Sequence, residues 1–116
     1  MNQFDLKNRT AIITGGAQGF GFDIAKRFLN SGAKVIIWDI DKNELLKASN
    51  ELNSTKLSYN IVDVSDYKQV KDTVNEIIKK SNIDILINNA GITGSTESLW
   101  NYDVLEWNKI VSINLM

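Results

Sequence analysis

Short runs of apolar residues alternate along the chain with stretches in which apolar residues recur every three or four positions. The short runs are rich in β-branched residues, which is typical of strands that are buried on both faces. The longer stretches have the spacing of helices with one apolar face. The pattern predicts strands at about residues 10–14, 34–38, 56–62 and 84–88.

Helices are predicted between these strands, and their ends carry recognisable signals. The first runs from about Gly19 to Asn30 and ends at Ser31-Gly32, a good C-terminal stop. Asp41 begins the second, because Glu44 follows it three residues later at the spacing of a capping box. A third helix is expected from about residues 65–66.

The last part of the chain also has helical spacing. Asp103 and Glu106 form a second capping-box pair, and a final helix is expected to follow them. Its expected inner face consists of Trp107, Ile110, Val111 and Leu115.

Strict alternation of strands and helices predicts an α/β fold, with a parallel sheet and helices on both faces. In such sheets, ligands bind at the carboxyl ends of the strands. The first predicted strand ends in a loop containing Gly15, Gly19 and Gly21, with the spacing G-x-x-x-G-x-G. Glycines permit a tight turn and let a pyrophosphate approach backbone N–H groups at a helix N-terminus. Taken alone, the spacing fits either a phosphate-binding loop or a simple turn.

The other strand ends also carry polar residues. Asp39 ends the second strand, eighteen residues after Gly21, near where a carboxylate reaches the ribose of an adenosine. Asp63 ends the third strand, and Asn88-Asn89 the fourth. Taken singly, each aspartate fits a purely structural role, as a helix cap or turn residue, as well as it fits a ligand contact. Packing alone does not account for polar residues at four successive strand ends.

Composition narrows the range of partners. The chain has 116 residues, 13 of them basic and 14 acidic, so one small domain with a net charge of -1 is expected. The absence of a basic block argues against nucleic acid or an anionic membrane as the main partner. The sequence has no cysteine and no histidine, so no disulfide and no metal site is expected. No stretch resembles a signal peptide or membrane span, and we expect a cytoplasmic protein.

Four motifs in this order resemble those of the short-chain dehydrogenase/reductase family. They are Thr14 to Gly21 for T-G-x-x-x-G-x-G, Asp63-Val64 for the adenine-binding pair, Asn88 to Gly91 for N-N-A-G, and Trp107 through Asn114-Leu115 for a later helix. The resemblance covers essentially the whole chain. It implies a Rossmann-type doubly wound sheet, a nicotinamide cofactor, and oxidoreduction of a small carbonyl or alcohol substrate.

The resemblance also implies roles for individual residues. Asp63 and the Val64 backbone would hold the adenine, whereas Asn114 would be the catalytic helix asparagine that helps hold a proton-relay water. The expected cofactor-binding residues are Gly15, Gln18, Gly19, Phe20, Gly21, Asp39, Ile40, Asp63, Val64, Asn89, Ala90 and Gly91. Among these, Asn89, Ala90 and Gly91 would line the nicotinamide ribose.

Asp39 predicts NAD rather than NADP. Its carboxylate can accept both ribose hydroxyls of NAD but would face the 2′-phosphate of NADP. Two like unit charges about 4 Å apart cost about 4 kcal/mol at an effective dielectric near 20. Screening reduces that cost and still leaves a preference of roughly tenfold or more. Gln18 occupies a loop position that is often basic in NADP-using relatives.

The family's chemistry needs a serine and a Tyr-x-x-x-Lys pair, in which the lysine lowers the pKa of the tyrosine. Their usual place lies beyond Met116. Tyr67 and Lys71 match the spacing formally, but we interpret them as a core tyrosine and a surface lysine on the third helix. Ser95 and Ser98 are not taken as the family's serine.

Met116 falls within the predicted final helix, so residues 1–116 are expected to be an incomplete dinucleotide-binding domain that ends in mid-helix. The expected strand order, 3-2-1-4, would leave the fourth strand as an uncovered apolar edge. Such an edge invites pairing with another chain, and we therefore expect a homo-oligomer.

Three hypotheses follow. The chain is the NAD-binding part of a dehydrogenase/reductase, a non-enzymatic module that binds NAD and self-associates, or the remnant of an interrupted gene. Alone, these residues are predicted to be inactive, because they lack the serine and a correctly placed Tyr-x-x-x-Lys.

Overall fold

The computed structural model of the chain describes residues 6–89 and 111–114. The element bounds lie within two residues of the predicted ones up to the fourth strand. The elements are β1 (Thr10–Thr14), α1 (Gly19–Asn30), β2 (Lys34–Asp39), α2 (Lys42–Leu52), β3 (Leu57–Ile61), α3 (Tyr67–Ile78), β4 (Ile85–Asn88) and β5 (Val111–Asn114).

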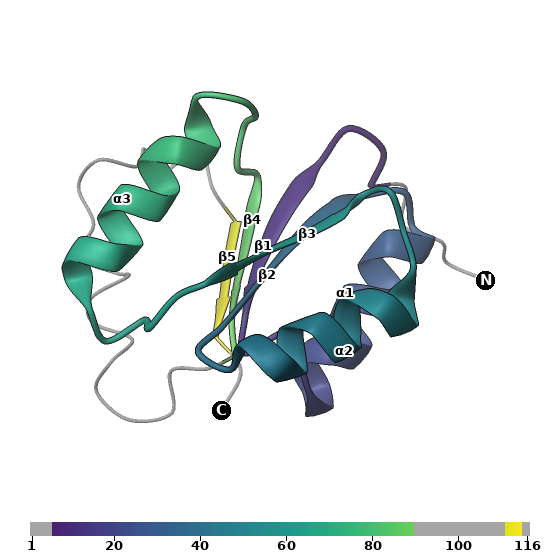
Figure 1. Ribbon diagram of the computed structural model, residues 1–116. Helices are drawn as coiled ribbons and strands as arrows, with labels where there is room; N and C mark the ends of the chain where they lie inside the picture. Colours follow the sequence, from purple (N-terminus) through teal and green to yellow (C-terminus); the bar gives the residue numbers. More distant parts are fainter. Residues whose placement is uncertain (1–5, 90–110, 115–116) are drawn as a thin grey trace.

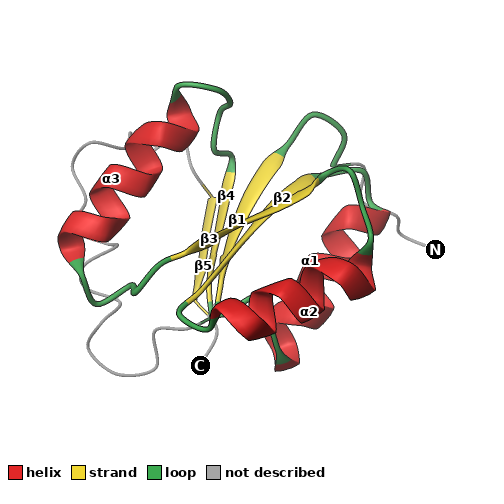
Figure 2. Cartoon of the chain, viewed as in Figure 1, coloured by secondary structure: helices red, strands yellow, loops and turns green. Residues whose placement is uncertain are grey.

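The described strands form one parallel sheet in the order β3-β2-β1-β4-β5. The helices α1 and α2 cover one face of this sheet, and α3 covers the other (Figure 1). Figure 2 shows the same three layers coloured by element type. The predicted Rossmann-type doubly wound sheet, with the order 3-2-1-4 for its first four strands, is confirmed.

Adjacent apolar residues on the central strands explain why helices pack on both faces. Successive side chains of a strand point to opposite faces, so Ile12 and Ile13 enter different halves of the core. Ile36 and Ile37 of β2 lie directly beside them in register. The half facing α3 contains Ile12, Ile36, Trp38, Val62, Val64, Val70, Val74, Ile83 and Leu86. The half facing α1 and α2 contains Ile13, Ala17, Ala25, Ala33, Val35, Ile37, Leu45, Ala48 and Ile87.

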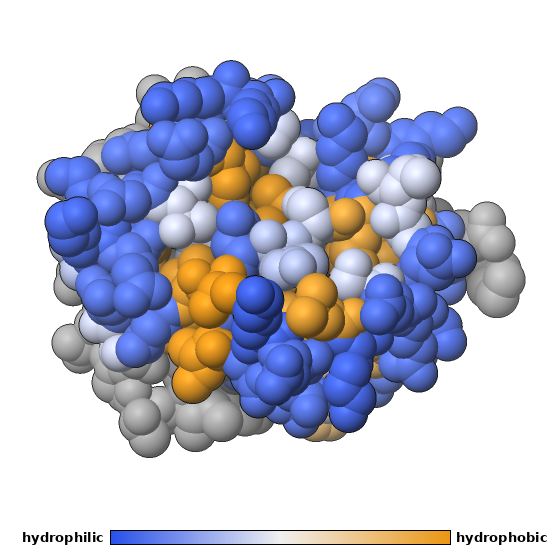
Figure 3. Space-filling model, in the orientation of Figure 1, coloured by the Kyte–Doolittle hydropathy of each residue, from blue (hydrophilic) through white to orange (hydrophobic). Residues whose placement is uncertain are grey.

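The distribution of polar and apolar residues on the surface agrees with these layers. The visible outer surfaces of α2 and α3 are mostly hydrophilic, and apolar surface gathers between them, around the edge strand β3 (Figure 3). Ile40 and Ile61 are large apolar residues with exposed fractions of 69% and 51%. None of the helices in the described ranges is long and apolar enough to cross a membrane.

The expectation of a helix at residues 111–114 is wrong, because Val111–Asn114 forms β5, parallel to β4. Val111 and Ile113 are β-branched residues at alternate positions, which suits a strand. Pairing with β5 also gives partners to the backbone groups on that side of β4. β4 is therefore not an edge, and the argument for self-association from a β4 edge loses its basis. The other residues expected in the final helix lie outside the described ranges.

We predict that Val74→Ala lowers the free energy of unfolding by about 2 kcal/mol, through the lost methyl groups and the cavity left under α3. Val74 is 1% exposed and packs in the half of the core that faces α3. Urea unfolding measures the change, with the exposed Lys80→Ala as control. Equal stability of the two variants would contradict the assigned packing of α3.

Candidate functional site

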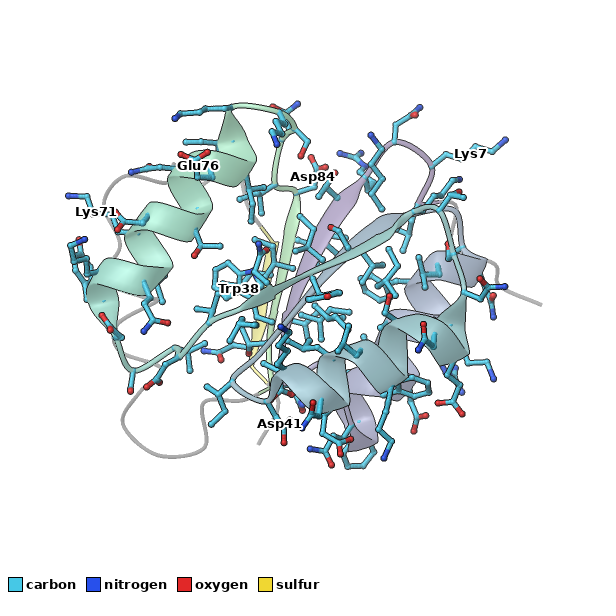
Figure 4. All side chains as sticks on the ribbon, viewed as in Figure 1. Lys7, Trp38, Asp41, Lys71, Glu76 and Asp84 are labelled. Atoms are coloured by element: carbon cyan, nitrogen blue, oxygen red, sulfur yellow. The ribbon has the colours of Figure 1, made fainter. Side chains whose placement is uncertain are left out.

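The carboxyl ends of four strands meet at one edge of the sheet, as predicted. Thr14 of β1 lies in register with Trp38 of β2 and with Asn88 of β4, while Asp39 pairs with Ile61 of β3. The loops that carry the predicted site residues leave the sheet at this edge. Asp41, just past β2, marks it in Figure 4, and Asp84, just before β4, marks the opposite end.

The hydroxyl of Thr14 joins the glycine loop to the segment after β4. Thr14 is fully buried, and its Oγ1 donates to Asn88 Oδ1 at 3.1 Å. The same oxygen accepts the Asn89 backbone N–H at 2.9 Å. The Asn89 amide then donates to the Gly15 carbonyl oxygen at 3.2 Å. Two motifs more than seventy residues apart in the sequence are thus held together by one short hydrogen-bonded chain.

The glycines of the loop divide into two physical roles. Gly15 and Gly19 have φ values of 64° and 58°, a backbone region that glycine occupies without steric cost. Gly16 and Gly21 are needed for close packing instead. A Cβ on Gly21 would lie 2.2 Å from the Gly15 carbonyl oxygen, and one on Gly16 would lie 2.6 Å from Ile37 Cγ2. A Cβ on Gly19 would meet no atom of the described residues within 4 Å, so the loop is open at that point.

The N-terminus of α1 differs from those of α2 and α3. Asp41 and Asp66 cap α2 and α3 through their side chains, whereas Gln18 makes no side-chain cap bond to α1. The first turn of α1, like that of α3, contains no acidic residue, whereas the first turn of α2 contains Glu44. The first backbone N–H groups of α1 and the positive end of its helix dipole therefore remain available for an anion. Phe20 stands beside them with 78% of its surface exposed.

Asp39 combines a turn contact with an accessible carboxylate. Its Oδ1 accepts the Asp41 backbone N–H at 3.2 Å, and the residue is partly exposed. The Gly16 N–H donates to the Trp38 carbonyl oxygen at 3.2 Å, which fixes the glycine loop against the end of β2. Trp38 is anchored in turn, because its indole Nε1 donates to Asn60 Oδ1 at 3.2 Å. The structure thus places the predicted Asp39 beside the predicted glycine loop.

Asp63 is exposed and hydrogen-bonded to Ser65. The Ser65 hydroxyl donates to Asp63 Oδ1 at 2.6 Å, and the Ser65 backbone N–H donates to the same oxygen at 2.9 Å. Both bonds lower the pKa of the Asp63 carboxyl below its usual value, and the bond from the hydroxyl has the larger effect. The side chain of Val64 is buried in the half of the core that faces α3.

Some predicted site residues are not brought into this arrangement. Ala90 and Gly91 lie outside the described residues. Asn114, expected on a helix, lies on β5 in register with Asn88. The catalytic role expected for Asn114 is therefore not shown by its position on a strand.

Sequence reasoning missed the part that buried polar residues play. Thr14 and Asn88 stand within the motifs, but the motifs alone assigned neither of them a role. Asn88 is fully buried, and its Nδ2 has no hydrogen-bond partner among the described residues. A polar residue at the end of an otherwise apolar buried strand was the available signal.

The interpretation of Tyr67 as a core tyrosine is wrong. Tyr67 is the first residue of α3, and 42% of its surface is exposed. Helix ends leave side chains beyond the packed face, which the apolar spacing alone does not show. Lys71 is a surface residue, as expected, and points away from the sheet in Figure 4.

Comparison with known proteins identifies the family and the relatives of the chain. The family model described as short chain dehydrogenase matches residues 9–116. The chain belongs to this family. A 3alpha-hydroxysteroid dehydrogenase of Mediterraneibacter gnavus is 37% identical over 115 residues, covering 95% of the chain and 46% of the relative. A 3-oxoacyl-[acyl-carrier-protein] reductase of Chlamydia muridarum is 38% identical over 114 residues, with the same two coverages.

Solved structures of short chain dehydrogenases agree with the fold. A 3-ketoacyl-(acyl-carrier-protein) reductase from Brucella melitensis, complexed with NADH, has a TM-score of 0.68 and 39% identity, covering 75% of the chain and 36% of that protein. A short chain dehydrogenase from Bacillus anthracis has a TM-score of 0.70 and 35% identity, covering 73% and 35%. The chain thus spans less than half the length of these relatives.

We predict that Gly21→Ala lowers the free energy of unfolding by about 3 kcal/mol, because the new methyl group overlaps the Gly15 carbonyl. Gly19→Ala has open space and carries only the left-handed backbone penalty, about 1 kcal/mol. Urea unfolding of both variants separates the two costs. A larger loss for Gly19→Ala would contradict the assigned packing of α1 on the loop.

Proposed function

We propose that the chain is the NAD(H)-binding part of a short chain dehydrogenase/reductase that interconverts alcohols and carbonyls. The observation that carries this proposal is the uncapped N-terminus of α1, which adjoins open space at Gly19. Family membership supports the oxidoreductase class. Neither the non-enzymatic module nor the gene remnant has an observation that favours it.

The pyrophosphate of the cofactor fits the first turn of α1. Free N–H groups and the helix dipole attract an anion there, and Gly19 has no side chain to block its approach. The buried bonds from Thr14 and Asn89 keep the loop in place without using those N–H groups. Loop and helix therefore offer a preformed anion site.

The remaining parts of the cofactor would lie along the same edge of the sheet. Asp39 accepts the adenosine ribose hydroxyls, and Ile40 lies beside it. Asp63 and the Val64 backbone hold the adenine, while Asn89 lies toward the nicotinamide ribose. Bound there, the nicotinamide supplies hydride transfer to or from the substrate carbon. Gln18, Phe20, Ala90 and Gly91 complete the proposed cofactor set.

The substrate is proposed only as a small carbonyl or alcohol compound. The two relatives described above are named for a hydroxysteroid and for an acyl-carrier-protein substrate, and both names describe oxidoreduction at a carbonyl or hydroxyl carbon. Asn114 is proposed to support the proton relay of this reaction. Self-association remains a prediction, to be tested by sedimentation.

We predict that the chain binds NAD at least about tenfold more tightly than NADP, through repulsion between Asp39 and the 2′-phosphate. Asp39→Ser removes that charge and should bring the two dissociation constants within about threefold. Isothermal titration of both dinucleotides measures the ratio. Equal affinity of the unmodified chain for NAD and NADP would refute the role given to Asp39.

We predict that the 116 residues bind NADH but reduce simple ketones at no rate above background. Their one Tyr-x-x-x-Lys sequence, Tyr67 to Lys71, is on α3 rather than in the glycine loop or next to Asn89. Absorbance of NADH over time measures the rate, with Tyr67→Phe as the matched variant. A measurable rate that disappears in Tyr67→Phe would overturn this prediction.

A further inference from the structure

In the turn that precedes α3, the second residue of a capping-box pair bonds to a different backbone N–H from the usual one. Asp66 and Gln69 have the capping-box spacing, in which the later side chain normally accepts the backbone N–H of the cap residue. Here the Asp66 N–H donates instead to the Asp63 carbonyl oxygen at 2.9 Å. Gln69 Oε1 is thereby free to reach three residues further back, and it accepts the Asp63 N–H at 3.0 Å.

The other end of the Gln69 side chain is also used. Its Nε2 donates to Asp66 Oδ2 at 3.0 Å, while Asp66 Oδ1 accepts the backbone N–H groups of Lys68 and Gln69. Both polar ends of one amide thus connect Asp63 to the capped first turn of α3. The Asp63 backbone is held at its N–H by Gln69 and at its carbonyl by Asp66.

The Asp63 carboxylate is oriented by a second contact. Ser65 donates twice to Oδ1, through its hydroxyl and its backbone N–H. Oδ2 makes no hydrogen bond with the described residues and is therefore available to a ligand. Next in sequence, the Val64 side chain is 8% exposed and anchored in the core, while its backbone N–H has no acceptor among the described residues. A fixed acceptor therefore stands beside a fixed donor on an exposed turn.

We propose that Gln69 is a positioning residue, which fixes the Asp63 backbone so that Asp63 can recognise the amino edge of adenine. Ser65 orients the carboxylate of Asp63 for the same contact. The inference rests on the proposed function, because it concerns the adenine end of the same cofactor site. Adenine offers a donating amino group beside an accepting ring nitrogen, which complements Oδ2 of Asp63 and the N–H of Val64. Fixing an exposed aspartate before binding reduces the entropy lost on binding.

Nicotinamide hypoxanthine dinucleotide provides the test. In this analogue an oxygen replaces the adenine amino group and the adjacent nitrogen carries a proton, so donor and acceptor are exchanged. The unmodified chain should bind NAD about tenfold more tightly than the analogue, the value of one hydrogen bond to a charged group. In Gln69→Met, which keeps the side-chain length and removes both hydrogen bonds, the preference should fall to about threefold or less.

Asn75→Met is the matched control, since it removes an amide six residues further along the same helix and should keep the full preference. Ser65→Ala should lower the preference in the same direction as Gln69→Met. A Gln69→Met chain that loses affinity equally for both dinucleotides, or that keeps the full preference, overturns the inference and leaves the proposed function standing. An unmodified chain that binds neither dinucleotide overturns the proposed function itself.

Discussion

Burial of β1 on both faces determines how the other elements are arranged. All five of its residues are buried, so a helix layer must cover each side of the sheet. Each helix between two strands brings the chain back to the edge where the previous strand began, so the paired strands run parallel, with their carboxyl ends at one edge. The glycine loop, Asp39, Asp63 and Asn89 share that edge for this reason, although they are far apart in the sequence.

Most of the fold could be predicted because its signals are local. The Asp41 cap of α2 and the C-terminal stop of α1 at Ser31-Gly32 are each encoded within a few residues of the helix boundary. Residues 111–114 were assigned wrongly, because an apolar stretch of mixed spacing fits a helix until β4 supplies a neighbouring edge. Tertiary pairing decided that element, and local propensity did not.

The site was predictable in its residues but not in its contacts. Glycines and aspartates at strand ends identified the edge, because ligands of parallel sheets bind where the strands end. The hydrogen bonds of Thr14 cross more than seventy positions, and no local pattern shows them. The spacing of Gln69 from Asp66 is that of a capping box and indicates a bond to Asp66 alone. Its bond to Asp63 depends on the turn in which the Asp66 N–H donates to the Asp63 carbonyl oxygen.

The sequence left two alternatives open for each aspartate, a turn residue or a ligand contact, and the structure shows that one carboxylate has room for both. Asp39 uses Oδ1 for the Asp41 N–H, and Asp63 uses Oδ1 for Ser65. In each residue the turn bond orients the carboxylate, while Oδ2 makes no hydrogen bond with the described residues. A turn contact at a strand end is therefore part of the argument for a ligand site, because it fixes in advance the oxygen that the ligand would meet.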